Sequence, residues 1–159
     1  MRLIPQALVA IMLVAILGGI MRFNRLQRED LEHRATARRE VARFQQQVLI
    51  QSAMTTERSY PQTIEISWFR GDVPRNPVLD PSRPWLEIAG MDEADRLHPI
   101  QPMAATEEIA EFWYNPWRGI VRARVPAGLN DTDALDLYNF INDSSLSNLF
   151  ASAGSDDPH

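Results

Sequence analysis

The sequence predicts an α+β protein, in which a long N-terminal helix packs at its far end on a small antiparallel β-sheet head that also carries a C-terminal helix. Three observations predict it. Residues 3–21 are almost wholly apolar, residues 22–57 contain neither proline nor glycine, and the rest of the chain places short alternating stretches between proline-rich segments. We therefore expect a membrane helix at 1–21, a stalk helix at 22–57, a head at 58–143 and a disordered tail at 144–159.

The apolar run from Leu3 to Met21 predicts a transmembrane helix that inserts in the lipid bilayer. It holds nineteen residues with one Gln and no charge. As a helix it spans roughly 28 Å, close to the hydrocarbon thickness of a bilayer. A cleavable signal peptide has a shorter apolar core and a small-residue cleavage site, and LGGIMRF offers no clear site of that kind. A buried core helix is the remaining alternative, but uncharged core helices are usually shorter.

The same helix is the predicted partner-binding surface. Helices in a membrane associate by close packing, which small residues favour, and Gly18-Gly19 lies near the end of the apolar run. We therefore expect the chain to form an oligomer in the membrane through this helix. The candidate contact residues are Leu8, Ile11, Val14, Leu17 and Gly18.

Composition and charge exclude several classes of function. The chain has no Cys, which removes disulfides, thiolate metal sites and thiol nucleophiles together. Residues 22–58 hold eight Arg against five carboxylates, and residues 59–159 hold seven Arg against sixteen carboxylates, so a net charge of +3 is followed by one of −9. Because binding to phosphates needs clustered basic residues, the acidic head argues against nucleic acid as a partner.

The stalk sequence changes character along its length. Its first part carries ion pairs at helical spacing, Arg28 with Glu32 and Asp30 with Arg34, which is typical of an exposed helix. Its second part carries an apolar stripe, which predicts that one face is buried against the head. The stripe consists of Ala37, Val41, Phe44, Val48, Leu49, Ala53 and Met54. A coiled-coil seam is the weaker alternative, because the heptads are few and mixed.

The head sequence predicts short strands separated by loops. Tyr60-Pro61 ends the long helix, and Thr63–Phe69 alternates like a half-buried strand. Residues 71–84 contain four prolines and must form a loop, after which Pro84–Ala89 can supply a second short strand. Residues 90–108 form another irregular connection. Because a head this small without disulfides is only marginally stable alone, we expect the stalk helix to complete its core.

A hairpin and a terminal helix complete the head. Glu111–Tyr114 and Ile120–Val125 flank Asn115–Gly119, whose residues are typical of a turn. The alternation places Val121, Ala123 and Val125 in the core and Arg122 and Arg124 outward. Asp133–Asn142 then predicts a helix capped by Asp131 or Thr132. Its buried face would hold Leu135, Tyr138 and Ile141.

This plan resembles the pilins and pseudopilins of type IV pilus and type II secretion systems. The residues that carry the resemblance are the segment ALVAIMLVAILGGIM, the unbroken continuation through Phe44–Met54, the Tyr60-Pro61 step and the hairpin NPWRGIVRARVP. Two features depart from the family pattern. The sequence has no clear prepilin peptidase site, and Pro5 stands where family members carry Glu.

The resemblance implies a place and a role. It implies a single-pass protein of the bacterial inner membrane, with its head in the periplasm and its long helix packed against those of other secretion-complex subunits. The arginines argue for the opposite orientation, because six of them lie between residues 22 and 41 against Arg2 before the apolar run. We follow the resemblance and expect a periplasmic head.

Few residues are candidates for chemistry or ligand binding. Asn130, Asp131 and Asp133 could bind Ca²⁺, although such a sequence before a helix is more often a cap, and we expect no other cofactor. Of the head tryptophans, we expect at least two of Trp85, Trp113 and Trp117 in the core and Trp117, at the hairpin tip, as an exposed partner-binding candidate.

The sequence therefore predicts a non-enzymatic subunit that acts by assembly. No phosphate-binding loop, paired metal-binding histidines or nucleophile elbow occurs. The alternative from another class is a membrane-tethered adaptor whose cytosolic head recruits a soluble partner. A third and weaker alternative is a tethered hydrolase that uses His98 with Asp92 or Asp95.

Overall fold

A computed structural model of the chain describes residues 3–54 and 59–150, and within the first helix it describes side chains at Met12 and from Ile16 onward. The chain divides into two compact units, Met1–His33 and Arg34–His159, and each is described by itself. The long helix α1 (Leu3–Met54) contributes to both units. Its predicted end near residue 57 lies outside the described residues.

The first unit is the N-terminal part of α1. Pro5 stands in its first turn, where a missing N–H costs little, and no other proline follows within the helix. Much of the predicted transmembrane segment consists of residues whose side chains lie outside the described part. Within the described part of the chain, no helix combines the length and the apolar character needed to cross a membrane.

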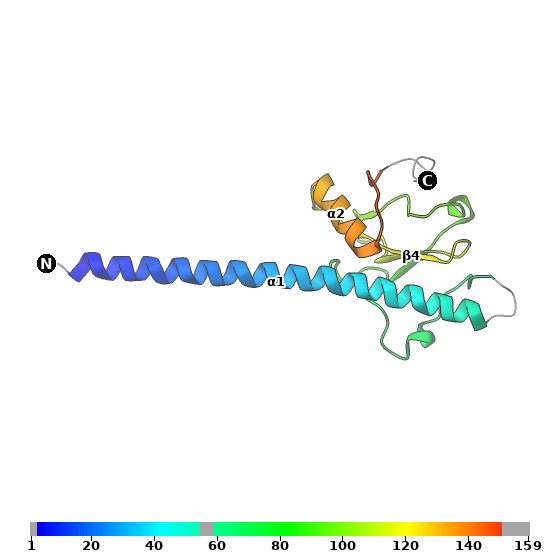
Figure 1. The fold of residues 1–159 in the computed structure, drawn as a ribbon, viewed down its shortest axis with the longest axis horizontal. Helices are drawn as coiled ribbons and strands as arrows, with labels where there is room; N and C mark the ends of the chain where they lie inside the picture. Colours follow the sequence, from blue (N-terminus) through cyan, green and yellow to red (C-terminus); the bar gives the residue numbers. More distant parts are fainter. Residues whose placement is uncertain (1–2, 55–58, 151–159) are drawn as a thin grey trace. The chain divides into compact units, whose positions relative to one another are not determined.

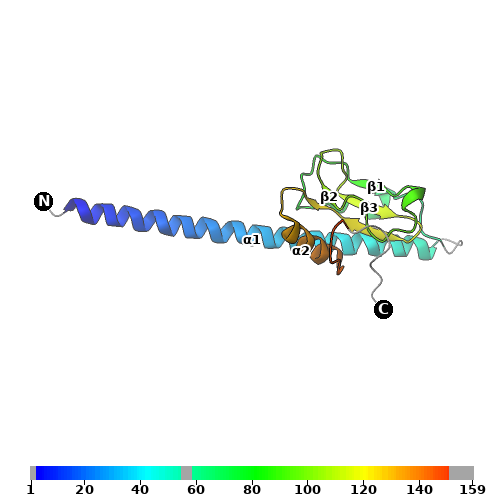
Figure 2. The same cartoon turned by 90° about the horizontal axis from the view of Figure 1, so that it is seen from above.

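The second unit packs strands and a short helix against the remainder of α1, as Figure 1 shows. Strand β3 (Phe112–Asn115) lies between β1 (Leu86–Ile88) and β4 (Ile120–Ala123) in one sheet, and β2 (Met103–Ala104) pairs with β5 (Val125–Pro126) in another. Figure 2 shows β1, β2 and β3 beside the second half of α1. Two single-turn 3₁₀ helices, η1 (Ile66–Phe69) and η2 (Met91–Glu93), and the helix α2 (Asp131–Asn142) complete the elements.

The predicted antiparallel sheet is in fact mixed. Strands β3 and β4 form the predicted hairpin, with Phe112 opposite Ala123 and Tyr114 opposite Val121. Strand β1, however, runs parallel to β3, and β2 runs parallel to β5. The physical reason is the connection between β1 and β3, which is long enough to cross over and return in the same direction, as a parallel pair requires. The α+β class with a long N-terminal helix and a C-terminal helix is confirmed.

The buried face of α1 in the second unit follows the predicted stripe. Ala37, Val41, Phe44 and Val48 are all at most 6% exposed. The Phe44 ring packs edge-on against Phe69 and Phe112 and is stacked on Trp85, with ring centroids 5.3–5.6 Å apart. The continuation of the stripe is wrong, because Leu49 and Met54 are 49% and 75% exposed and Ala53 is exposed as well. These three residues do not continue the three-and-four spacing of the buried face.

The predicted strand at Thr63–Phe69 is wrong. Ile66, one of the residues that the alternation points inward, is 59% exposed, and the segment from Ile66 to Phe69 turns as η1 instead. The N–H of Trp68 donates to the carbonyl oxygen of Glu65, which closes the turn. This turn lets Phe69 reach the aromatic cluster around Phe44, so tertiary packing overrides the period-two pattern.

The inward residues of the hairpin strand are confirmed, but one of its arginines is misplaced. Val121, Ala123 and Val125 are fully buried. Arg124, predicted to face outward, is only 2% exposed. Its guanidinium donates to the carbonyl oxygens of Gln101 and Ala110 and forms an ion pair with Glu87 at 2.9 Å. The second face of the hairpin is therefore covered by other chain segments, and the alternation does not separate core from solvent there.

The C-terminal helix begins with a different cap from the predicted ones. Asn130 is the cap of α2, and its Oδ1 accepts the N–H of Asp133 at 2.9 Å. The predicted inner face is confirmed for Tyr138 and Ile141, which are fully buried, and Leu135 is packed against the core. The helix ends at Asn142, and its C-cap Asp143 has a left-handed backbone with φ of 50°.

The segment after α2 differs from the predicted tail for as far as it is described. Leu146 and Leu149 pack against the hydrophobic core. The side chain of Asn139 holds this segment, because its Oδ1 accepts the N–H of Leu146 and its Nδ2 donates to the carbonyl oxygen of Leu146, both at 2.9 Å. Because the segment is rich in Ser, its composition did not indicate that these two leucines would be packed against the core. Residues 151–159 of the predicted tail lie outside the described residues.

Candidate assembly surface on the first helix

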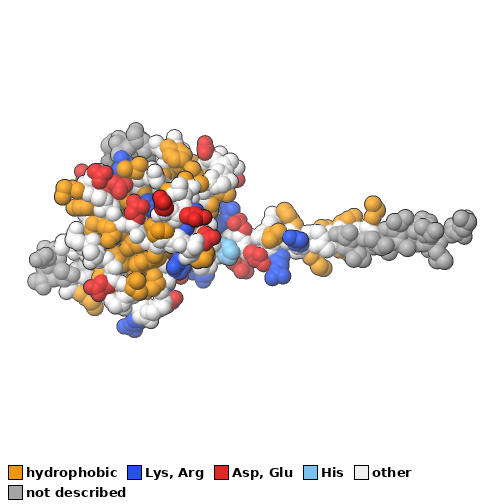
Figure 3. All heavy atoms as spheres, turned by 180° about the vertical axis from the view of Figure 1, so that it is seen from behind, with side chains coloured by type: hydrophobic (Ala, Val, Ile, Leu, Met, Phe, Trp, Pro, Cys, Tyr) orange, Lys and Arg blue, Asp and Glu red, His pale blue; other side chains and the backbone are white. Residues whose placement is uncertain are grey.

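The first unit exposes an unusual amount of apolar side chain for a helix in water. Figure 3 shows apolar side chains along the described part of this helix. Each of the large apolar residues described there is more than half exposed. They are Met12, Ile16, Leu17, Ile20, Met21, Phe23, Leu26 and Leu31. Single exposed apolar residues are ordinary, but a contiguous set marks a surface that another molecule or a membrane covers.

These side chains point in several directions around the helix. At 100° per residue, Met12, Ile16 and Ile20 share one side, and Leu17 and Met21 lie on another. A helix that is apolar all round is normally buried, either within a protein or in a membrane. Among the described side chains, the apolar surface extends from Met12 to Met21, and its all-round character ends at Arg22.

No contact or backbone conformation within the described part of the chain requires glycine at positions 18 and 19. A Cβ atom built at Gly18 or Gly19 would meet nothing within 4 Å, and neither residue needs a positive φ. A glycine inside a helix destabilises it by about 0.5–1 kcal/mol relative to alanine. The fold of the chain itself therefore gives no reason for glycine here. A close approach by a second helix would give one.

The structure describes two of the five predicted contact residues on this helix. Leu17 is 56% exposed, and Gly18 is also exposed. The side chains of Leu8, Ile11 and Val14 lie outside the described residues. The structure thus leaves two of the five candidates on an open surface of the first unit, and it says nothing of the other three.

The tryptophans of the head fall into buried and exposed classes. Trp113 is fully buried, and its indole N–H donates to the carboxylate of Glu93 at 3.3 Å. Trp85 is packed against the core and donates to the carbonyl oxygen of Pro74 at 2.8 Å. Trp117, at the hairpin tip, is 40% exposed, as expected of a contact residue.

The calcium candidates are used as a helix cap. Asn130 Oδ1 accepts the N–H of Asp133, and Asn130 Nδ2 donates to the Asp133 carboxylate at 2.8 Å. This arrangement satisfies the start of α2 and is the ordinary role of such a sequence. Among the residues that the structure describes, no three His, Asp or Glu side chains lie together as metal ligands would.

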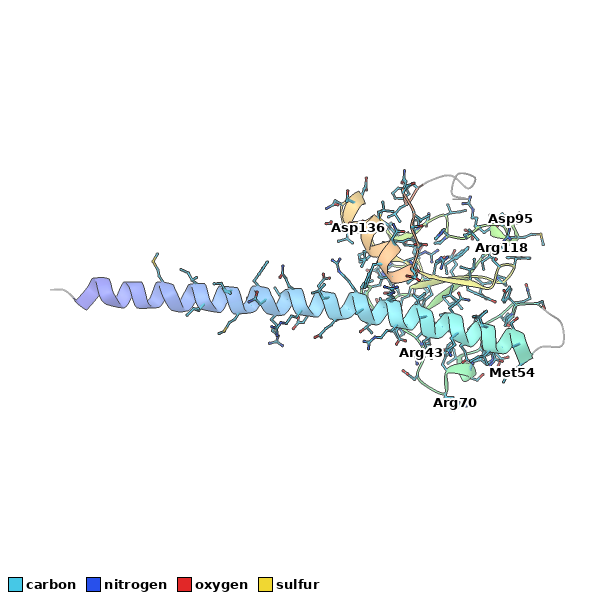
Figure 4. The ribbon with its side chains drawn as sticks, in the orientation of Figure 1. Arg43, Met54, Arg70, Asp95, Arg118 and Asp136 are labelled. Carbon is cyan, nitrogen blue, oxygen red and sulfur yellow. The ribbon has the colours of Figure 1, made fainter. Side chains whose placement is uncertain are left out.

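Two of the residues considered for hydrolysis, His98 and Asp95, take part in structural contacts. His98 Nδ1 lies 3.1 Å from the Tyr138 hydroxyl, and the two rings are in contact. Burial raises the pKa of Tyr138 above its ordinary value. Asp95 forms an exposed ion pair with Arg118 at 2.9 Å, which can be followed in Figure 4. Each of these contacts fixes a loop or a turn on the head.

One buried acid was missed by the sequence analysis. Glu111 is fully buried and accepts hydrogen bonds from Arg75 and from the N–H of Asn76, the latter at 2.8 Å. Burial raises the pKa of its carboxyl, and the two donors partly offset that effect. Glu111 thereby ties the proline-rich loop to β3. Nothing in the pattern of the loop or the strand signals this long-range pairing.

Comparison of the chain with protein-family models, with curated proteins and with solved structures found no match in any of the three.

Proposed function

We propose that this protein is a non-enzymatic, pilin-like subunit of a membrane assembly. The apolar start of α1 anchors it as a single-pass protein of the bacterial inner membrane and packs against the corresponding helices of other subunits. The head lies on the periplasmic side and contributes surface contacts, including Trp117. Its biological role is then structural, in a complex of the secretion or pilus type.

The observation that carries the proposal is the exposed, all-round apolar surface of the first unit. Residues such as Ile16, Leu17 and Ile20 are more than half exposed, and about 25 cal/mol is gained for each Å² of apolar surface removed from water. Lipid and neighbouring helices are the two environments that cover such a helix on every side. Gly18, which the chain itself does not require, supports helix contact.

The assembly is tested by disulfide cross-linking, because the chain has no native cysteine. Leu17→Cys is produced in membranes and oxidised, with Ser67→Cys on the exposed surface of the head as the matched control. We expect a cross-linked dimer for Leu17→Cys alone. We also expect Gly18→Leu, combined with Leu17→Cys, to reduce the cross-linked fraction, because the larger side chain keeps the helices apart. Equal cross-linking of the two single variants would overturn the proposal.

A specific observation favours a second candidate function. The excess of arginines after the apolar run, six between residues 22 and 41, is typical of a cytoplasmic flank. In that orientation the protein would be a tethered adaptor whose head recruits a soluble partner in the cytoplasm.

The orientation is decided by labelling a single cysteine in the head. Glu107 is exposed, so Glu107→Cys is accessible to a membrane-impermeant maleimide. Labelling of intact cells with a permeabilised outer barrier places the head in the periplasm and supports the pilin-like subunit. Labelling only after lysis places the head in the cytoplasm, which rejects that subunit and favours the adaptor.

A further inference from the structure

A basic stripe follows the apolar surface directly. Arg22, Arg25 and Arg28 are spaced three residues apart, so they lie along one side of α1, within about 120° of each other. All three are exposed. The segment from residue 22 to residue 28 contains no carboxylate, so it carries a local charge of +3. We call these three residues the basic stripe.

Apolar side chains occur at the same level of the helix. Phe23 and Leu26 alternate with the arginines in the sequence and are 60% and 55% exposed. Their directions differ from that of the basic stripe, since at 100° per residue Phe23 lies roughly 160° and Leu26 roughly 100° from its centre. The segment is therefore amphipathic, with a basic side and an apolar side that are both open. This combination is typical of a helix segment at a membrane interface.

Two acids, Glu29 and Glu32, follow the basic stripe on the same side of α1. Glu29 accepts from Arg25 Nε at 2.9 Å, and the Arg25 side chain in this pair remains 82% exposed. A guanidinium carries five N–H donors, of which this bond uses one. The stripe thus retains donors that a phosphate can accept in pairs, as arginine and phosphate groups commonly do.

We propose that Arg22, Arg25 and Arg28 form a binding surface for the headgroups of anionic phospholipids. This inference rests on the proposed membrane anchor, because it places the stripe where the bilayer meets water. The arginines would bind the phosphodiester groups, while Phe23 and Leu26 enter the acyl boundary. The surface would fix the depth of the helix and concentrate anionic lipid around each subunit.

The test uses a fluorophore placed just before the stripe. Met21 is 72% exposed, and the chain has no native cysteine, so Met21→Cys in the full chain accepts a single bimane label. The labelled protein is reconstituted in phosphatidylcholine vesicles that contain either acyl-brominated phosphatidylglycerol or acyl-brominated phosphatidylcholine. Bromine quenches bimane at short range, so the ratio of the two quenching curves reports which lipid is enriched beside residue 21.

We expect phosphatidylglycerol to be preferred about fivefold or more, since one basic residue near an anionic surface contributes about that factor. Replacing all three stripe arginines by Gln should abolish the preference. Arg39→Gln, Arg70→Gln and Arg118→Gln, combined in one chain, remove the same charge at other exposed positions and should preserve it.

The two proposals fail in different ways. If neither brominated lipid quenches the label, residue 21 is not at a bilayer and the proposed anchor is wrong. If both lipids quench equally in the wild-type background, the anchor stands and the headgroup site is rejected. A preference that survives loss of the stripe, or that disappears equally in the control chain, also rejects the site, because the selectivity then reflects net charge or another surface.

Discussion

The two halves of α1 differ in the exposure of their apolar side chains. In the second unit, Phe44 and Val48 are fully buried because the strands and η1 of the same chain cover them. In the first unit, Ile16 and Leu17 are 58% and 56% exposed. Both segments are helical, so the local structure does not distinguish them. The difference lies in the exposure of the apolar side chains, which the strands and η1 cover in the second unit.

The largest effect is expected when one apolar residue is truncated in each half of α1. Phe44→Ala removes a ring that touches Phe69, Trp85 and Phe112, and we expect it to lower the free energy of unfolding of the head by about 3–5 kcal/mol. Leu17→Ala should change it by less than about 0.5 kcal/mol. Denaturant unfolding in detergent, followed by tryptophan fluorescence, measures both.

Similar losses for the two variants would contradict the comparison. They would mean that Leu17 also contributes to the stability of the head, although its side chain is 56% exposed.

A second prediction concerns how the helices protect the sheet. The outer edge of β4 is covered by side-chain amides, because Gln45 bonds Gly119 and Val121, and Asn142 bonds both backbone groups of Ala123 at 2.7 and 2.9 Å. An uncovered edge would expose unpaired N–H and C=O groups. Asn142→Ala leaves two buried groups without partners, so we expect a loss of about 2–4 kcal/mol.

Hydrogen exchange at the Ala123 amide, together with denaturant unfolding, measures this loss. Asn148→Ala is the matched control, because the Asn148 side chain, as far as the described residues show, bonds only the exposed backbone N–H of Phe150. We expect the control to change stability by less than about 0.5 kcal/mol. Faster exchange at Ala123 in the control would instead indicate general loosening of the head.

The smallest expected effect is a dependence on pH. The folded state raises the pKa of Glu111 above its ordinary value near 4.5, so it binds this proton more tightly than the unfolded chain does. The contribution of Glu111 to stability is therefore largest below pH 4.5 and falls as the pH rises through its raised pKa. We expect Glu111→Gln, which cannot ionise, to lack this decline.

Unfolding of both proteins across that range of pH, with Glu108→Gln as an exposed control, measures the difference in slope. A decline of the same size in wild type and Glu111→Gln would show that the buried carboxyl does not cause it. The control should follow the wild type.

Local sequence patterns predicted much of the fold. The three-and-four spacing from Ala37 to Val48 predicted the buried face of α1, because a helix brings such residues to one side whatever they meet there. The hairpin was readable because Asn115–Gly119 supplies turn residues, and Gly119 has a φ of 64° that favours glycine. The apolar run at the start of α1 was equally evident in composition.

Long-range pairing decided the rest. No local pattern states that β1 joins β3 in parallel, that Glu111 binds the loop at Asn76, or that Asn142 covers the edge of β4. Arg124 became buried because Gln101, Ala110 and Glu87, all distant in sequence, satisfy its guanidinium. The sequence alone determined the helical periodicity, the turn and the apolar run, since these depend on neighbouring residues. Only the tertiary structure decided which polar groups are buried, because that depends on partners brought together by folding.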